Sequence, residues 1–523
     1  MSLHTEIDLA DVLARAARLY PDRLAVVAGD VRLTYRSLAE RVGRLAAGLA
    51  RHGLVAGDRL ALLDRNSFRY MEVNFACAVL GVILVPLNIR LAAREIANIL
   101  GQIDAKLALV AKSMIAVGRQ ALEQTPGAPP LVTWAEADGL GADNLYESLL
   151  VDAPPPVRRG ASADIAQIFF TSGTTGEPKG VCLTRGNLVA SALDSLATLH
   201  ITQHTVWLHA GPMFHLVDAF AIWTVTMVGG VHVVTHFDPA RLSALVATHR
   251  ITMTSLPPTL IHMIVSRGNP EGHDLSTLDR ISYGGAPMDE ALHRRASSFF
   301  RCPLLQAYGI TETSGLVTQQ VPGDHSLDGN APKPARRGST GQPAPNIELR
   351  VADDDDNDVA HGMPGELCIR GPRVMAGYWK KPGATATAMR GGWYHSGDIG
   401  YRDAEGYFYV LDRKKDMIIT GGENVYSAEV EGALLSHPGV LEAAVFGVPS
   451  ERFGEEVKAV VLLRAGASAS ADDLISHCRA RIGGYKVPRS IEFVMEPLPK
   501  SGPGKVAKHI LREPYWRGRA RRI

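Results

Sequence analysis

The chain has almost no net charge. Its 523 residues include 55 Lys and Arg against 54 Asp and Glu, which leaves a formal charge of +1. Proteins that bind nucleic acid or an anionic membrane usually carry a basic excess. We therefore expect no nucleic-acid partner. The basic stretch 517–522 leaves two alternatives for that end of the chain, a solvated tail, which we favour, or weak peripheral membrane contact.

Cysteine is scarce, and long apolar runs are missing. The five cysteines lie far apart and never in CxxC spacing, which excludes a disulfide framework and favours a reducing compartment. The first twenty residues are acidic and amphipathic, unlike a signal peptide. The apolar stretches 75–89 and 220–234 are too short or too interrupted to span a membrane. We expect a cytoplasmic protein without a transmembrane segment, in which both stretches form buried helix and strand.

Two changes of pattern divide the chain. Helical and short β-rich segments alternate over residues 40–310, which indicates mainly parallel sheets covered by helices. Gly, Pro and short β-rich runs dominate 320–411, and a charged stretch at 412–416 precedes a second tract of helices and strands. Charged connectors often mark domain boundaries. The expected fold is α/β, with a large N-terminal domain (1–411) that includes a β-rich subdomain at about 320–411, and a small mobile α+β C-terminal domain (417–523).

The run of aspartates at 353–358 lies between two expected strands. It lacks the alternating ligand spacing of a calcium loop, so we predict a solvated hairpin turn in preference to a cation site.

The most informative stretch is TSGTTGEPKG at residues 171–180. Apolar residues precede it and a β-rich run follows it, so the expected context is strand, loop, strand. A Walker A loop would need GK[ST] opening onto a helix, and no GK[ST] occurs anywhere in the sequence. Glycines that expose main-chain N–H groups, hydroxyl side chains and one lysine are nevertheless suited to holding phosphate.

This stretch resembles the phosphate-binding loop of the adenylate-forming (AMP-binding) enzymes, which include acyl-CoA synthetases, adenylation domains of peptide synthetases and beetle luciferases. Further motifs follow in the family's order: YGGAP at 283–287 with QAYGITET at 306–313, WYHSGD at 393–398, DRKKDMIITGGENVY at 412–426, and PKSGPGK at 499–505. The resemblance therefore extends over nearly the whole chain. It implies that residues 1–411 form an adenylation domain, that 412–416 is a hinge, and that 417–523 is a lid domain.

The resemblance also implies a role for each matching residue. The residues implied for binding ATP and AMP are Thr171, Ser172, Gly173, Thr174, Thr175, Lys179, Gly285, Ala286, Tyr308, Gly309, Thr311, Asp398 and Arg413. The other implied roles are Mg²⁺ binding by Glu312 and Thr171, catalysis by Lys505 and His215, hinge rotation at Lys415, coenzyme A binding by Gly421 and Gly422, and an acyl pocket formed by His215, Asp218, Ala307 and Ser314. The implied cofactor is Mg²⁺, and the implied substrates are ATP, a carboxylic acid and coenzyme A.

Three positions depart from the family's usual residues. Ser396 replaces a threonine and keeps its hydroxyl. Ser427 stands where proline is frequent, and we expect it to cap the following helix. Asp218 follows the PxFH motif of His215 where many relatives have Gly or Ala. For Asp218 we favour a helix cap over a polar group presented to the substrate.

The acid itself is weakly specified by the sequence. Small residues at Ala307, Gly309, Ser314 and Gly315 would leave room for a long or bulky acyl group, and no arginine in these segments could bind a second carboxylate. Medium- or long-chain fatty acids are therefore the first expectation, and aryl or arylpropenoic acids the second. Only 18 residues follow Lys505, too few for a fused carrier domain.

Coenzyme A is accordingly the expected acceptor, and a separate carrier protein is the alternative. A luciferase-like activity and a non-enzymatic nucleotide sensor have less support, since Glu312 and Lys505 are both retained. A homodimer is kept as an option for the assembly.

The implied role of Lys505 gives a first prediction. A lysine charge beside the carboxylate and α-phosphate would stabilise the charge that develops during adenylation, so Lys505→Ala should slow acyl-adenylate formation by about 10²- to 10³-fold. Thioester formation from supplied acyl-adenylate should change little, and Lys500→Ala should affect neither step strongly. Single-turnover assays of the two steps would measure this. Equal loss of both steps in Lys505→Ala would contradict the assigned role.

Overall fold

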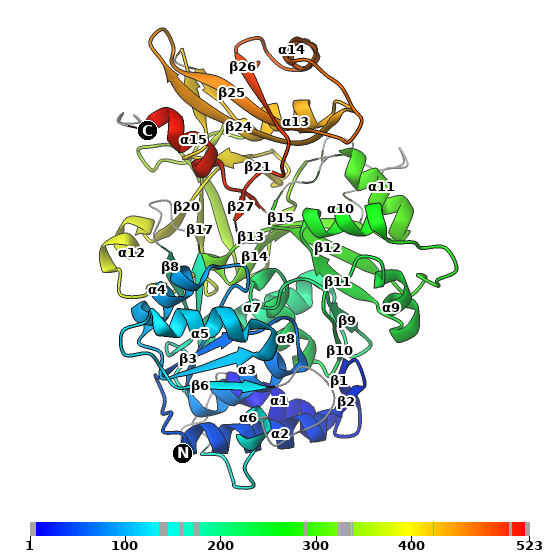
Figure 1. Cartoon of the computed structure of the whole chain (residues 1–523), viewed down its shortest axis with the longest axis vertical. Coiled ribbons are helices and arrows are strands. Elements are labelled where there is room, and N and C mark those ends of the chain that lie inside the picture. Colours follow the sequence, from blue (N-terminus) through cyan, green and yellow to red (C-terminus); the bar gives the residue numbers. More distant parts are fainter. Residues whose placement is uncertain are drawn as a thin grey trace.

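A computed structural model describes the chain at residues 7–134, 145–156, 160–171, 178–286, 288, 290–322, 324, 336, 338–421, 423–501 and 505–517. Figure 1 shows two large sheets with their helices at the N-terminal end of the molecule, a third sheet above them, and the C-terminal sheet at the opposite end. The chain is α/β, as the alternating sequence pattern predicted.

The first large sheet, sheet A, has nine strands that are parallel at the centre and antiparallel at both edges. Its order is β15 (Gln342–Pro343), β14 (Gly315–Gln319), β13 (Leu304–Ile310), β12 (Arg280–Gly284), β11 (Met253–Leu256), β9 (Val206–His209), β10 (Val231–Val234), β1 (Leu24–Ala28) and β2 (Val31–Thr34). The carboxyl ends of β12 and β13 are neighbours, and ligands of parallel sheets bind at such edges.

The second large sheet, sheet B, has seven strands and the same plan of parallel centre and antiparallel edge. Its order is β18 (Gly377–Tyr378), β8 (Lys179–Thr184), β7 (Ile165–Thr171), β4 (Ile83–Pro86), β3 (Arg59–Leu63), β5 (Leu107–Ala111) and β6 (Leu131–Trp134).

Helices cover both sheets. They are α1 (Leu9–Leu19), α2 (Tyr35–Arg51), α3 (Phe68–Leu80), α4 (Ala93–Ile103), α5 (Ile115–Glu123), α6 (Leu145–Ser148), α7 (Arg185–Leu199), α8 (Leu216–Met227), α9 (Leu242–His249), α10 (Pro258–Arg267) and α11 (Glu290–Phe300), with short 3-10 turns at η1 (Lys112–Met114) and η2 (Thr311–Thr313). Local sequence fixes several starts. Thr184, for example, accepts from the Asn187 amide while the Asn187 side chain accepts from the Thr184 amide, which caps α7.

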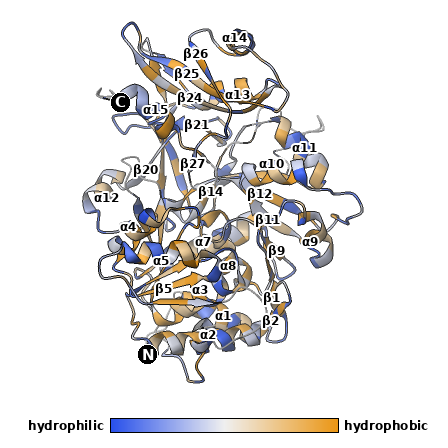
Figure 2. Cartoon of the chain, viewed as in Figure 1, coloured by the Kyte–Doolittle hydropathy of each residue, from blue (hydrophilic) through white to orange (hydrophobic). Residues whose placement is uncertain are grey.

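The apolar stretches 75–89 and 220–234 are buried helix and strand, as predicted: the first forms the end of α3 and β4, the second most of α8 and β10. Figure 2 shows strands such as β5 in hydrophobic colours between helices whose outer faces are mixed. Over the part of the chain that the structure describes, no helix combines the length and the apolar character needed to cross a membrane.

The strand-rich segment forms a third sheet, sheet C, in the order β16 (Glu348–Ala352), β17 (Gly365–Arg370), β20 (Trp393–Arg402) and β19 (Met389–Arg390), with β21 (Phe408–Arg413) paired to β20 and α12 (Pro382–Ala388) beside it. The strands β15 and β18 from the same stretch join sheets A and B instead. The segment therefore connects the two large sheets.

A fourth sheet, sheet D, lies at the C-terminal end: β23 (Glu423–Val425), β22 (Ile418–Thr420), β25 (Gly454–Leu463), β24 (Val440–Ser450) and β26 (Ser490–Val494), with α13 (Ser427–Leu435), α14 (Ala471–Arg479), α15 (Lys508–Trp516) and the small pair β27 (Lys500–Ser501) and β28 (Lys505–Val506). The predicted cap by Ser427 is wrong. Ser427 is already the first residue of α13, and its hydroxyl donates to Asp412 Oδ2 at 2.6 Å.

One buried charge holds the helical layer of the N-terminal end together. Glu72 on α3 is fully buried, and its carboxylate accepts hydrogen bonds from Arg41 on α2 and, at 2.7 Å, from the Tyr146 hydroxyl on α6. Arg41 also pairs with Glu147 at 2.9 Å. Removing one partner of a buried ion pair leaves the other charge uncompensated.

We therefore predict that Glu72→Ala lowers the free energy of unfolding by about 1–3 kcal/mol, since it leaves the buried Tyr146 hydroxyl without its acceptor and removes one of the two carboxylate partners of Arg41. The exposed Glu40→Ala on the same layer should change it by less than about 0.5 kcal/mol. Urea unfolding measures both. Similar values for the two variants would contradict the importance of this pair.

Candidate functional site

The glycine-rich stretch connects two paired strands, as predicted. β7 and β8 are antiparallel, and their last pair is Thr171 opposite Lys179. The Thr171 hydroxyl donates to the Lys179 carbonyl at 3.5 Å. The predicted phosphate-binding residues Ser172, Gly173, Thr174 and Thr175 lie outside the described residues.

A tyrosine that the sequence did not indicate joins this hairpin to Glu312. Tyr378 on β18 pairs with β8, and Lys179 Nζ lies 5.0 Å from the centre of its ring. The Tyr378 hydroxyl donates to Glu312 Oε1 at 3.1 Å. Glu312 belongs to η2, directly after β13. Residues that were predicted for phosphate and metal thus lie in one chain of contacts.

Glu312 is surrounded by protein, and this burial raises the pKa of its carboxyl above the ordinary value. A main-chain hydrogen bond, the nearby Arg413 and the Tyr378 hydroxyl partly oppose the rise in pKa. Burial therefore destabilises the ionised form of Glu312, and a bound cation would offset this destabilisation.

Asp398 is the centre of a second group of contacts. It is 3% exposed, accepts from the Tyr308 hydroxyl at 2.6 Å, and pairs with Arg413 Nε at 2.6 Å. Asp398 on β20 is the register partner of Arg413 at the end of β21, while Tyr308 comes from β13. Asp398 and burial both act on Arg413, and the net effect raises the pKa of its guanidinium. These three predicted residues are brought together.

Local hydrogen bonds explain the orientation of Asp398. The Ser396 hydroxyl accepts from the Asp398 amide at 3.0 Å, so serine supplies the group that the usual threonine would. Gly397 adopts φ 69°, which favours glycine, and its amide donates to Glu366 Oε1 at 3.0 Å.

The residues predicted for adenine follow β12 and lie beside Tyr308. Gly284 pairs with Ala307 in the parallel register, which places Gly285 and Ala286 next to Tyr308 at the carboxyl edge of the sheet. A Cβ on Gly285 would meet no atom within 4 Å, so its outer face is open. Thr311 lies in η2, next to Glu312.

Two of the small residues predicted to leave space for the acyl group are instead engaged in packing and hydrogen bonding within the protein. A Cβ on Gly309 would lie 2.1 Å from the Gly315 carbonyl, so this glycine permits close contact between β13 and β14. Ser314 is fully buried and donates to the Arg373 carbonyl at 2.8 Å. No arginine stands in these segments themselves, but buried Arg373, far away in sequence, packs against Ser314 and pairs with Asp194 at 3.5 Å.

His215 and Asp218 lie at the start of α8. His215 is half-buried and precedes the helix as its N-terminal flanking residue. The expectation that Asp218 caps the helix is wrong: it lies within the first turn, is fully buried, and both carboxylate oxygens bond inside the protein, to Trp207 and His209. A Cβ on Gly315 would lie 3.8 Å from the Leu216 carbonyl, so the loop after η2 faces the start of α8.

The remaining predicted residues lie in the C-terminal part. Lys415 has an exposed side chain, and its carbonyl accepts from Arg512 Nη1 at 3.1 Å. Gly421 is the exposed turn between β22 and β23, and Gly422 lies outside the described residues. Lys505 opens β28, opposite Ser501.

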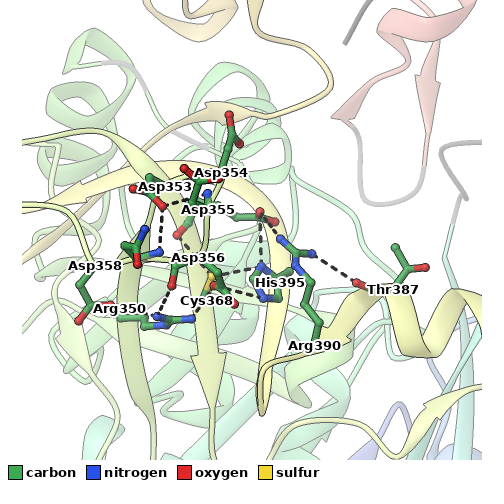
Figure 3. A network of polar contacts seen from close by, with 12 residues as sticks. Arg350, Asp353, Asp354, Asp355, Asp356, Asp358, Cys368, Thr387, Arg390 and His395 are labelled. Atoms are coloured by element: carbon green, nitrogen blue, oxygen red, sulfur yellow. Dashed lines mark hydrogen bonds and ion pairs between the residues drawn. The ribbon is translucent and has the colours of Figure 1, made fainter.

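The aspartate run forms the hairpin between β16 and β17, as predicted, and several of its carboxylates are paired (Figure 3). Asp356, Cys368 and His395 bring possible metal donors within 4.8 Å of one another. However, the thiol faces Nδ1 of the histidine at 3.4 Å and the carboxylate faces Nε2 at 3.7 Å, so one ion could not bind all three without rearrangement. Arg350 already pairs with Asp356 at 2.6 Å, and burial raises the pKa of the Cys368 thiol to about 12. We interpret the cluster as an ion-pair network.

The geometry therefore provides an aromatic ring, a buried carboxylate with its arginine, a second carboxylate able to bind a cation, and a lysine beside a glycine-rich hairpin. Together these groups could hold a ring, vicinal hydroxyls, a hard cation and phosphate.

The chain is similar to known proteins over nearly its whole length. Feruloyl-CoA synthase of an Amycolatopsis species is 38% identical over 96% of this chain and 98% of its own length. Indoleacetate–CoA ligase of Aromatoleum aromaticum is 35% identical over 97% of this chain and 98% of its own length. The solved structure of o-succinylbenzoate coenzyme A synthetase from Bacillus subtilis, in complex with ATP and magnesium ion, is 30% identical, covers 95% of this chain and 98% of its own, and superposes with a TM-score of 0.82.

Two family models also match. Residues 13–379 match the AMP-binding enzyme family, and residues 429–505 match the AMP-binding enzyme C-terminal domain. The match confirms the resemblance drawn from the motifs, and the chain belongs to the AMP-binding enzyme family.

Proposed function

We propose that this protein is an ATP-dependent acid–CoA ligase that activates an aryl-substituted carboxylic acid as its acyl-adenylate and transfers the acyl group to coenzyme A. The observation that carries the proposal is the joining of Tyr308, Asp398 and Arg413, from two sheets, beside Glu312 and the β7–β8 hairpin. That group suits an adenosine with its phosphates, and two relatives that match nearly the whole chain are named as acid–CoA ligases.

Two considerations favour an aryl acid over the fatty acid expected first. Feruloyl-CoA synthase and indoleacetate–CoA ligase are both named for acids that carry an aromatic ring. In addition, the space expected from Gly309 and Ser314 is filled by the protein's own main chain, which disfavours a long open tunnel. A compact, flat acid fits this description better than an extended chain.

The proposed roles of the nucleotide-binding residues follow from their contacts. Tyr308 would stack on the adenine beside Gly285 and Ala286. The Asp398 carboxylate would accept from both ribose hydroxyls, with Arg413 holding it in position. Lys179 and the main-chain N–H groups of the hairpin would hold the phosphates.

Two chemical steps follow from this arrangement. The acid's carboxylate oxygen attacks the α-phosphorus of ATP and pyrophosphate leaves, with Lys505 neutralising the developing charge. The coenzyme A thiolate then attacks the acyl carbon, and AMP leaves. His215 would border both the acid and the thiol, since it begins the helix that the loop after η2 faces.

Glu312 fits the cation that such a reaction uses. Glu312 accepts from Tyr378, whose ring lies against Lys179, so a hard carboxylate lies on the same chain of contacts as the end of the β7–β8 hairpin. Mg²⁺, when bound, would neutralise phosphate charge; Glu312 would hold it, with Thr171 as a second contact.

The contacts of residues 412–416 support a hinge at Lys415. Lys414 Nζ bonds to Asp354 of sheet C at 2.7 Å, whereas the Lys415 carbonyl bonds to Arg512 of α15, and Asp416 pairs with the same arginine at 3.7 Å. Lys414 thus bonds towards sheet C and Lys415 towards α15, while Asp412 at the start of the stretch already bonds to Ser427 of α13. Rotation there would exchange Lys505 for Gly421 and Gly422 at the site, as the two steps require.

The raised pKa of Glu312 leads to a pH-dependent prediction. Because the carboxyl stays protonated to a higher pH than an ordinary glutamate, it loses its capacity to bind Mg²⁺ earlier as pH falls. The Mg²⁺ concentration for half-maximal rate should therefore rise as pH is lowered from 7.5 towards 5.5. In Glu312→Gln it should be about 10- to 100-fold higher and nearly independent of pH.

The exposed Glu40→Gln is the matched control for the Glu312 variant and should behave as wild type. Glu312→Gln with an unchanged Mg²⁺ requirement would exclude Glu312 as the ligand.

The acid preference is tested by a panel of arylpropenoic, arylacetic, benzoic, octanoic and hexadecanoic acids, with pyrophosphate release and CoA thioester as the two readouts. We expect kcat/KM for the best aryl acid to exceed that for either fatty acid by about tenfold or more. A higher kcat/KM for a fatty acid than for every aryl acid would favour the fatty-acid substrate that the sequence suggested first. Replacing coenzyme A by a phosphopantetheinylated carrier protein tests the alternative acceptor, for which we expect at most about one tenth of the rate.

A further inference from the structure

A line of buried polar side chains joins α8 to the centre of sheet A. Trp207 and His209 come from β9 and His232 from β10, with Trp207 and His232 as register partners. Asp218 in the first turn of α8 and Thr226 in the last turn complete the line. All five residues are fully buried.

The hydrogen bonds in this line form one continuous chain. Asp218 accepts from Trp207 Nε1 at 3.0 Å and from His209 Nδ1 at 2.7 Å. His209 Nε2 lies 2.9 Å from His232 Nδ1, and His232 Nε2 lies 2.9 Å from the Thr226 hydroxyl. With Asp218 ionised, every donor can point the same way, from Thr226 through the two imidazoles to the carboxylate. Burial lowers the pKa of His232 well below its ordinary value, which agrees with a neutral ring in the chain.

This chain restricts how α8 can lie on the sheet. Most of α8 is buried and apolar, and its contact with β9, β10 and β11 would otherwise allow the helix to slide or rotate. Asp218 and Thr226 lie at opposite ends of α8, and each meets its partner in only one register. Any displacement would leave polar groups buried without hydrogen bonds, which is unfavourable for each group. The chain therefore fixes the start of α8.

The turn before α8 is fixed a second time, from sheet B. Asn66, which follows β3, donates to the carbonyls of His209 at 3.0 Å and Gly211 at 2.6 Å, and accepts from the Met213 amide at 2.9 Å. A Cβ on Gly211 would lie 2.9 Å from the Ser255 carbonyl and 3.1 Å from Asp218 Cβ. The turn at 210–215 is therefore packed against the same carboxylate that ends the polar chain.

We propose that Asp218 and Asn66 are positioning residues that hold the 210–215 turn in place. The turn in this way holds His215 where it borders the bound acid. They would act on recognition of the acid and on thioester formation, and not on ATP, whose proposed binding residues lie on or next to β8, β12, β13, β20 and β21. The proposal rests on the proposed function of His215.

The experiment compares Asp218→Ala with Asp218→Asn, using the best acid of the panel. Asp218→Ala should raise the KM for the acid about tenfold or more and leave the KM for ATP within about twofold, since a misplaced turn weakens acid binding alone. Asp218→Asn should recover most of the loss. Its amide oxygen still accepts from Trp207, its amide nitrogen can donate to His209, and both imidazoles can reverse so that Thr226 accepts.

Glu72→Ala is the matched control, because it removes another fully buried carboxylate, whose own hydrogen-bond partners lie on α2 and α6. It should lower the melting temperature without changing the ratio of the two KM values. Asn66→Ala removes the second attachment and should raise the acid KM in the same selective way, even if Asp218→Ala does not fold. Equal changes in both KM values, or none in either, in folded Asn66→Ala and Asp218→Ala would overturn the proposal.

Hydrogen exchange separates failure of this inference from failure of the proposed function. The amides of residues 213–219 should exchange faster in Asn66→Ala than in wild type by about tenfold, and no faster in Glu72→Ala. A wild-type protein that makes no thioester would contradict the ligase proposal alone, and unchanged exchange in Asn66→Ala would contradict the positioning of the turn.

Discussion

The contact on which the site depends most is the pairing of Asp398 with Arg413 under the hydroxyl of Tyr308. It joins β20 and β21 of sheet C to β13 of sheet A, and its arginine ends β21 within the connector at 412–416. A carboxylate buried in this way is costly unless it is fully paired. Its presence therefore constrains two sheets and the start of the connector at once, and in the proposed function the same carboxylate binds the ribose.

Much of this arrangement could be predicted from the sequence, and the rest could not for definite reasons. The strand–loop–strand setting of residues 171–180 followed from apolar residues on both sides, and the buried nature of 75–89 from its length. Motif strings identified Tyr308, Asp398 and Arg413, because those strings are specific to the family. The contact of Tyr378 with Glu312 could not be predicted, because the two residues are 66 positions apart and meet only when β18 pairs with the edge of sheet B.

The errors concerned side chains whose partners are distant in sequence. Asp218 has the position of a helix-capping residue in the local pattern, but its partners are on β9, and a helix laid on a sheet is fixed by such contacts and not by the helix sequence alone. Ser427 likewise bonds to Asp412 instead of its own helix. The space expected around Ser314 is not open, because Arg373 from a distant segment packs against it. Local patterns determine which element forms, whereas packing determines what its polar groups bond to.

The close contact of β13 with β14 bears on how the acid preference of this chain could change in evolution or by engineering. Gly309 and the Gly315 carbonyl leave no volume for even one methyl group, so substitutions at these positions would disturb the edge of sheet A proposed for the nucleotide before they changed the proposed acid site. Changes in acid selectivity are therefore expected at the start of α8. Side chains there can be exchanged without contact with the strand that carries Tyr308. Recognition of the nucleotide and choice of the acid are in this way separable traits of one scaffold.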